Sequence, residues 1–233
     1  MPRHDRAQKL IDHLLSHPDS CESDGVAYEL LNEYFRGSPI ETLRVLLSSS
    51  DDRLVGEATW IASELPELGK PLLKDVRGLL GHQSKKVRFW AVLCVLLWAD
   101  SSNGCELASA IPLVDDIEKG VRWQAMGFLS MTSREQLQAA LAQLRAENAN
   151  SPYICELGWL LGPEGGDPVQ ITAALQDPDS RRRKFGAAAA FRIAKTAIEP
   201  LRYAASADDP EIAQFAGDML KRISSAHPDA AGQ

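Results

Sequence analysis

The sequence of 233 residues is poor in cysteine, histidine and aromatic side chains, and each scarcity argues against a class of site. The four cysteines are far apart and form no Cys-x-x-Cys pair, so we expect neither a metal site nor a disulfide framework. We predict that the thiols are buried and reduced. The five histidines follow no regular spacing, and no phosphate-binding loop, dinucleotide fingerprint or nucleophile elbow occurs. The sequence therefore predicts no metal, no cofactor and no catalytic residue.

Long apolar runs are missing as well. A membrane-spanning helix needs about 20 apolar residues. The longest apolar run, Phe89 to Ala99, is closed by Arg88 and Asp100, which is typical of a buried helix. Residues 1–5 lack the apolar core of an export signal. We expect a cytoplasmic protein without contact to a membrane.

The net charge is −7, and this acidity argues against a general nucleic-acid binder, because neutralising phosphates needs clustered Lys and Arg. The charges are unevenly spread. Residues 70–105 carry six basic and two acidic side chains, and residues 181–203 carry seven basic and one acidic. Residues 151–180 carry five acids and no Lys or Arg. The two basic blocks are compatible with local binding of an anionic partner.

A short frame recurs along the chain: a polar cap, an aliphatic anchor three residues later, and a small residue four positions after the anchor. Its anchors are separated by 33, 34, 33, 28 and 30 residues, and one copy is degenerate, with Arg at the anchor. The six copies are Asp51/Leu54/Ala58, Ser84/Val87/Ala91, Glu118/Val121/Ala125, Ser151/Ile154/Gly158, Asp179/Arg182/Gly186 and Asp209/Ile212/Ala216.

The frame predicts the start of a helix that packs closely against a neighbour. The polar residue can cap free N–H groups, and the anchor and the small residue share one helix face. Each frame is expected to open the second helix of a pair. A further pair is predicted at residues 5–16 and 25–36, capped by Asp24 and ended by Gly37. The first helices are predicted at residues 40–48, 71–80, 106–114, 135–147, 168–176 and 198–206.

Two copies resemble the HEAT-repeat signature, an Asp in the turn followed six residues later by Arg: Asp116 with Arg122, and Asp177 with Arg183. A third copy keeps Val-Arg but has His82 in place of the Asp. The resemblance implies an all-α, right-handed α-solenoid of about six to seven antiparallel helix pairs. The resemblance covers residues 40–226, and with the pair that opens the chain we expect a single domain over residues 1–226. The parts are a capping pair at 1–37, six repeats at 40–226 and a disordered tail at 227–233.

Beside the predicted core face, the second helices carry a row of cations and aromatics. One interpretation is an Asp–Arg ladder that joins repeats, with the aromatics in the core between them. The other is a groove for a protein segment with acidic or aromatic side chains. Trp60, Trp90 and Trp98 are expected in the core. The predicted partner-binding residues are Arg88, Phe89, Arg122, Trp123, Trp159, Arg183 and Lys184.

The sharpest charge feature is the basic run of residues 181–184, which cannot lie on one helix face. Two interpretations stay open, an anionic partner or pairing within the chain. The acids considered for pairing are Glu164, Asp167, Asp177 and Asp179.

The sequence predicts a non-catalytic scaffold or adaptor that binds another protein. One concrete version is a bacterial immunity or antitoxin-type protein. Residues 28–37 resemble bacterial HEAT-like proteins associated with such systems, and an acidic protein would suit a basic toxin. The alternative is a nucleic-acid-binding protein, or an enzyme similar to HEAT-like DNA glycosylases that act on modified bases. No Asp lies beside Trp123 on the same face for that role, so nucleic acid is the less favoured partner.

Overall fold

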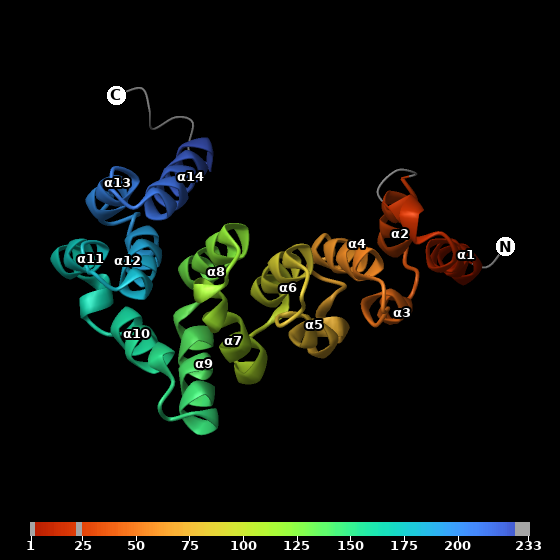
Figure 1. Cartoon of the computed structure of the whole chain (residues 1–233), viewed down its shortest axis with the longest axis horizontal. Coiled ribbons are helices and arrows are strands. Elements are labelled where there is room, and N and C mark those ends of the chain that lie inside the picture. Colours follow the sequence, from red (N-terminus) through yellow and green to blue (C-terminus); the bar gives the residue numbers. More distant parts are fainter. Residues whose placement is uncertain (1–2, 22–24, 227–233) are drawn as a thin grey trace. The chain divides into compact units, whose positions relative to one another are not determined.

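The computed structural model describes residues 3–21 and 25–226, and these residues form α-helices and short 3-10 helices without any strand (Figure 1). This confirms the predicted all-α class. The chain divides into two compact units, residues 1–100 (unit 1) and residues 101–233 (unit 2). The predicted extent of a single domain stays a prediction. The expected tail at 227–233 and the expected cap Asp24 lie outside the described residues.

The described part of unit 1 consists of stacked helix pairs. In each pair the two helices pack together, α1 on α2, α3 on α4 and α5 on α6, and the second helices α2, α4 and α6 follow one another side by side. The elements are α1 (Arg3–Ser16), the 3-10 helix η1 (Pro18–Cys21), α2 (Val26–Phe35), η2 (Ile40–Leu43), α3 (Arg44–Leu47), α4 (Asp52–Ser63), η3 (Lys70–Leu72), α5 (Leu73–Leu79) and α6 (Lys85–Trp98).

Unit 2 continues with helix pairs but departs from a simple stack. The helix α8 packs directly on α12 and also touches α14, whereas α10 packs against α9 and α12. The second helices therefore do not follow one another in chain order here. The elements are α7 (Gly104–Ala110), η4 (Ile111–Asp115), α8 (Lys119–Met131), α9 (Arg134–Glu147), α10 (Pro152–Leu161), η5 (Glu164–Gly166), α11 (Pro168–Leu175), α12 (Ser180–Arg192), α13 (Glu199–Ala205) and α14 (Pro210–Ala226).

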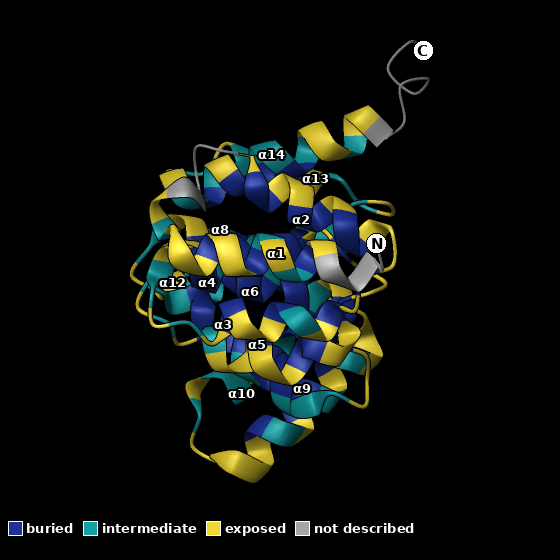
Figure 2. Ribbon diagram, turned by 90° about the vertical axis from the view of Figure 1, so that its right-hand side faces the viewer, coloured by how far each residue is buried: buried dark blue, intermediate teal, exposed yellow. Residues whose placement is uncertain are grey.

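The recurring frame marks the buried stripe of the second helices, and Figure 2 shows such stripes alternating with exposed faces. The anchors Leu54, Val87, Val121 and Ile212 are at most 2% exposed. Their small partners on the same helices are fully buried. The anchors of α10 and α12, Ile154 and Arg182, are only half-buried. The two frames with half-buried anchors thus belong to the region where the packing order changes.

The aspartates of the frame act as helix caps. Asp51, Asp179 and Asp209 accept hydrogen bonds from backbone N–H groups in the first turn of their helices. Ser84 makes no such side-chain bond, and neither do Glu118 and Ser151. Gly37 follows α2 with φ +96°, a left-handed conformation that favours glycine, so the predicted end of this helix is confirmed.

The thiols do not all behave as expected. Cys94 is buried, and burial raises the pKa of its thiol well above the ordinary value. Cys105 is half-buried and Cys155 is exposed, so the prediction was wrong for Cys155. This residue follows the half-buried anchor of α10, at a position that turns away from the packed face.

Ala125→Leu should lower the free energy of unfolding by about 2 kcal/mol, because the added atoms overpack a closed helix interface. Ala125 lies on α8 and is fully buried. Ala142→Leu, on the exposed side of α9, is the matched control and should change stability little. Urea unfolding of the two variants measures the difference. Equal stabilities would show that Ala125 faces no close neighbour.

Candidate functional site

Three of the predicted cations close the turn that precedes their own helix. The guanidinium of Arg88 donates to the carbonyl oxygens of His82 and Gln83, at 2.7 and 2.9 Å. Arg122 and Arg183 donate in the same way to the carbonyls six and five residues before them, at 2.7 to 3.0 Å. The repeated Arg therefore has a structural role in each of these three turns. Whether it also contacts a partner stays a prediction.

The residue at the signature Asp position accepts a hydrogen bond from the backbone N–H two residues later. Asp116 and Asp177 accept through a carboxylate oxygen at 2.8 Å. His82 accepts through Nδ1 at 3.1 Å, and Ser49 accepts through its hydroxyl at 3.1 Å. This position of the turn requires a side chain whose hydrogen-bond acceptor reaches the backbone N–H two residues later. His82 therefore replaces the signature Asp in function, which a comparison of residue types alone does not reveal.

The basic run is paired within unit 2. Arg181 and Lys184 both contact Asp115, at 2.6 and 3.1 Å. Arg182 pairs with Glu156 at 3.1 Å, and its guanidinium lies over the ring of Trp159 with 4.9 Å to the centroid. These partners come from η4 and α10 rather than from the four acids considered in the sequence.

The remaining cations and the aromatic at the start of α8 also have partners in unit 2. Arg183 pairs with Asp209 at 3.0 Å. Arg122 pairs with Glu211 at 2.8 Å, and Trp123 packs edge-on against Phe215 with ring centroids 6.1 Å apart. These contacts join α12 and α8 to the start of α14.

The free energy of unfolding should fall as the pH drops below 3.8, the ordinary pKa of an Asp side chain. Burial opposes ionisation of Asp115 and Asp209, but hydrogen bonds from Arg181, Lys184 and Arg183 outweigh it and hold the pKa of each carboxyl below 3.8. As the pH falls, the unfolded chain therefore binds more protons than the folded protein. The stability that these two carboxylates contribute is present above pH 3.8 and is lost below it.

Urea unfolding at about pH 5.5 and about pH 3 measures this loss. The Asp115→Asn/Asp209→Asn variant should lose less stability over that interval than the wild type. An equal loss would assign the acid sensitivity to other carboxyls. Glu156 acts in the opposite direction, because burial raises the pKa of its carboxyl despite the contact with Arg182.

The second helices of unit 1 present a different surface, rich in exposed aromatic side chains. On α2, Tyr28 is 63% exposed and Phe35 is 60% exposed, seven residues apart on one face. Trp60 on α4 and Trp90 on α6 are half-buried. The rings of Tyr28 and Trp60 meet edge-to-face with centroids 4.8 Å apart. Phe89, one of the predicted partner-binding residues, meets Trp90 in the same manner at 4.8 Å.

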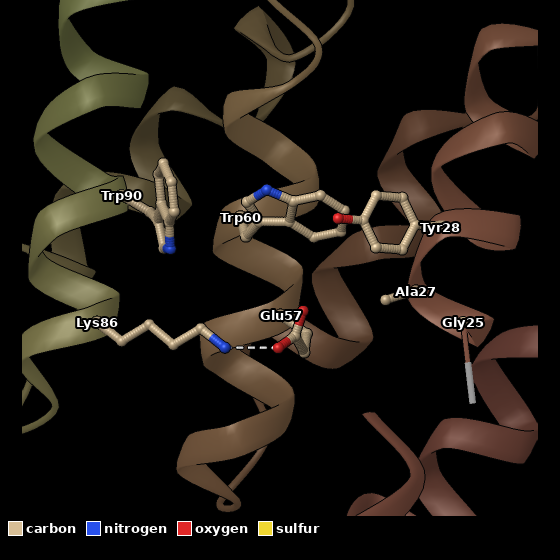
Figure 3. Close-up of a pocket in the computed structure, with 7 residues that line it drawn as sticks. All are labelled: Gly25, Ala27, Tyr28, Glu57, Trp60, Lys86 and Trp90. Atoms are coloured by element: carbon tan, nitrogen blue, oxygen red, sulfur yellow. Dashed lines mark hydrogen bonds and ion pairs between the residues drawn. The ribbon is translucent and has the colours of Figure 1, made fainter. Parts of the chain in front are cut away.

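Between these aromatics lies a pocket of about 320 Å³. In Figure 3, Trp90 reaches in from α6 and Tyr28 from α2 on either side of Trp60, and all three rings lie on the same side of an ion pair. That pair joins Lys86 Nζ to the carboxylate of Glu57 at 2.5 Å. The Glu57 side chain is 11% exposed and the Lys86 side chain is 43% exposed. The pocket thus combines aromatic rings with a nearly buried carboxylate.

The sequence does not reveal this pocket, because its pattern predicts two of the pocket residues in the core. Trp98 is buried as predicted, but the predictions for Trp60 and Trp90 were wrong, since both line the pocket. Trp60 and Trp90 lie at different distances from their anchors, six and three residues on. No single recurring register therefore groups the two residues. Their proximity comes from the packing of α4 on α6.

Within residues 3–21 and 25–226, no group of three His, Cys, Asp or Glu side chains is placed to hold a metal ion. In the same residues, no helix is both long and apolar enough to cross a bilayer.

No family model and no curated protein matches this sequence. Three of the solved structures that are similar to it cover nearly the whole chain. A designed armadillo repeat protein in complex with the peptide (KR)4 has 17% identity and a TM-score of 0.49, over 95% of this chain and 99% of its own. Two engineered proteins have 16% and 15% identity and TM-scores of 0.46 and 0.43. They cover 95% and 96% of this chain, and 92% and 89% of their own lengths.

Similarities of this size carry no functional argument. The helix packing within each unit shows an all-α architecture of helix pairs.

Proposed function

We propose that this chain is a non-catalytic protein-binding module and that the aromatic face of α2, α4 and α6 is its binding surface. The exposure of Tyr28 and Phe35 on α2, together with the pocket that Tyr28 lines with Trp60 and Trp90, carries this proposal. Contiguous exposed apolar patches mark interaction sites, and aromatic side chains supply much of the binding energy at protein interfaces. The half-buried indoles offer flat apolar surfaces at little cost in conformational entropy.

The partner segment was expected to bear acidic or aromatic side chains. Aromatic side chains are supported by the ring surfaces of the pocket. The expectation of acidic side chains relied on Arg88, Arg183 and Lys184, which are engaged within the protein. In the aromatic pocket of unit 1, Lys86 is the cation that would receive an acidic side chain. The proposed surface keeps Phe89 from the predicted set, while partner binding by the other six residues stays a prediction.

A finer hypothesis is an immunity or antitoxin-type role, supported by the net charge of −7, which favours a basic partner. The residues of the stretch that suggested this role, 28–37, include Tyr28 and Phe35 of the proposed surface. The alternative nucleic-acid-binding function depends on Arg88, Arg122 and Arg183. Because these cations are held by the protein's own groups, we favour a protein partner.

The test is affinity capture from the source cell with two matched double variants. Tyr28→Ser/Phe35→Ser removes exposed aromatics from the proposed surface. Val45→Ser/Leu68→Ser removes exposed apolar side chains elsewhere in unit 1, where Val45 is 48% and Leu68 is 43% exposed. The amount of each protein that the wild type retains should fall by about tenfold with the first variant. It should be unchanged with the second variant.

Equal retention by both double variants would refute the proposed surface. Circular dichroism establishes first that both variants are folded, as expected for substitutions at exposed positions.

A further inference from the structure

We propose that the pocket between Trp60 and Trp90 accepts an arginine side chain of the partner protein, whose guanidinium takes the place of Lys86 at the carboxylate of Glu57. This inference rests on the proposed function, because it names the side chain that the aromatic face recognises. It concerns residues of unit 1 alone. Figure 3 shows the three rings and the ion pair that carry it.

The carboxylate of Glu57 is the first reason. Its side chain is only 11% exposed, yet the cation paired with it has a side chain 43% exposed. A nearly buried carboxylate needs a cation, because leaving it unpaired away from water is costly. The lysine that supplies this cation reaches in from the neighbouring helix α6 and can return its ammonium to water. The ion pair is therefore open to exchange with a cation from outside.

The aromatic rings decide which cation is favoured. A guanidinium is planar, is more weakly hydrated than an ammonium, and stacks on indole faces. It can also donate two parallel hydrogen bonds to one carboxylate, whereas the lysine ammonium acts as a point charge. An arginine would gain stacking on Trp60 or Trp90 together with a two-point contact to Glu57. Lysine from a partner would gain little over Lys86, which is already present.

Other occupants fit less well. An acidic side chain would be drawn to Lys86 but would lie beside Glu57 and against the negative faces of the aromatic rings. A purely apolar side chain would cover the ion pair and take charged groups out of water without a new partner. Of the side chains compared, arginine satisfies the carboxylate and the rings together. The ammonium of Lys86 then moves into solvent.

The test uses small probes with the full chain: Nα-acetyl-arginine amide, the citrulline analogue, which is neutral and nearly isosteric, and the lysine analogue. Binding is followed by chemical-shift changes of the indole N–H groups of Trp60 and Trp90, assigned with single Trp→Phe variants. The arginine probe should give saturable shifts at these indoles. The citrulline probe should bind about tenfold more weakly, because it lacks the charge.

Two substitutions at the ion pair should act in opposite directions. Glu57→Gln should weaken the arginine probe by about tenfold, since the charged acceptor is lost. Lys86→Met should strengthen it severalfold, because the competing cation is removed. Lys86 is half-exposed, so this variant tests the idea even if Glu57→Gln folds poorly. Glu64→Gln, at the exposed end of the same helix α4, is the matched control and should leave binding unchanged.

Arginine binding that Glu57→Gln leaves intact, or that Lys86→Met weakens, would overturn the proposal, and the second result would show that Lys86 does not compete with the probe. Absence of any shift with the arginine probe would also overturn it. In each of these cases the capture experiment with the Tyr28/Phe35 variant still decides whether the face binds a protein. Failure of the arginine site and failure of the proposed function are therefore distinguishable.

Discussion

Gly165→Ala should lower the free energy of unfolding by about 3 kcal/mol, at the upper end of the usual effect of overpacking. Gly165 belongs to η5, directly after α10, and has no room for a side chain. A Cβ at this position would lie 2.3 Å from the carbonyl oxygen of Leu160 and 2.7 Å from its carbonyl carbon. Both atoms are backbone, so neither can move aside as a flexible side chain would. The expected result is a strained or displaced η5.

The neighbouring glycine provides the control. Gly166 is exposed, and a Cβ there would meet nothing within 4 Å. Gly166→Ala should change the free energy of unfolding by less than about 1 kcal/mol. Neither glycine has a positive φ, so the contrast isolates packing from backbone conformation. Urea unfolding of both variants measures it, and similar values for the two would show that the segment moves without strain.

Arg192→Met should also lower the free energy of unfolding by about 3 kcal/mol. The guanidinium of Arg192, at the end of α12, donates to the carbonyl oxygens of Leu129 at 2.9 Å and Thr132 at 2.6 Å. The last carbonyls of a helix have no partner within it, and a cation there also complements the helix dipole. Arg192 therefore caps the end of α8 from another helix. Met keeps much of the side-chain length but leaves these carbonyls unpaired.

Arg202→Met is the matched control, because Arg202 is exposed on α13 and its loss should change stability little. Thermal unfolding by circular dichroism compares the two variants. If Arg192→Met has the same melting temperature as the wild type, water must satisfy the carbonyls at the end of α8.

The positions of the helices could be predicted from the sequence because their starts and their buried stripes have local causes. The predicted first helices at 71–80, 135–147 and 168–176 correspond to η3 with α5, α9 and α11. Asp51, Asp179 and Asp209 act as caps as expected, since a carboxylate two residues before an N–H group reaches it without help from the rest of the fold.

The candidate site could not be predicted, because it depends on distances between helices. The sequence pointed to Arg88, Arg122 and Arg183 as part of a row, but their guanidinium groups turn back to carbonyls of the preceding turn. The pocket residues Trp60 and Trp90 looked like core residues, since a helical pattern does not tell whether a neighbouring helix covers a given indole. Burial of a large side chain is decided by the neighbour as much as by its own helix.

Unit 2 should unfold as one cooperative block rather than repeat by repeat. In a linear stack of repeats, each repeat contacts only its neighbours. The repeat at the end of the stack can therefore unfold while the other repeats stay folded. In unit 2, α8 (Lys119–Met131) packs directly on α12 (Ser180–Arg192), with the three helices α9, α10 and α11 between them in the sequence. Bringing α8 and α12 together closes the long chain segment between them. This slows folding, because the segment loses conformational entropy before the contact forms. Because of the same contact, α8 and α12 should open together. The backbone amides of the two helices should therefore exchange hydrogen with the same free energy of opening.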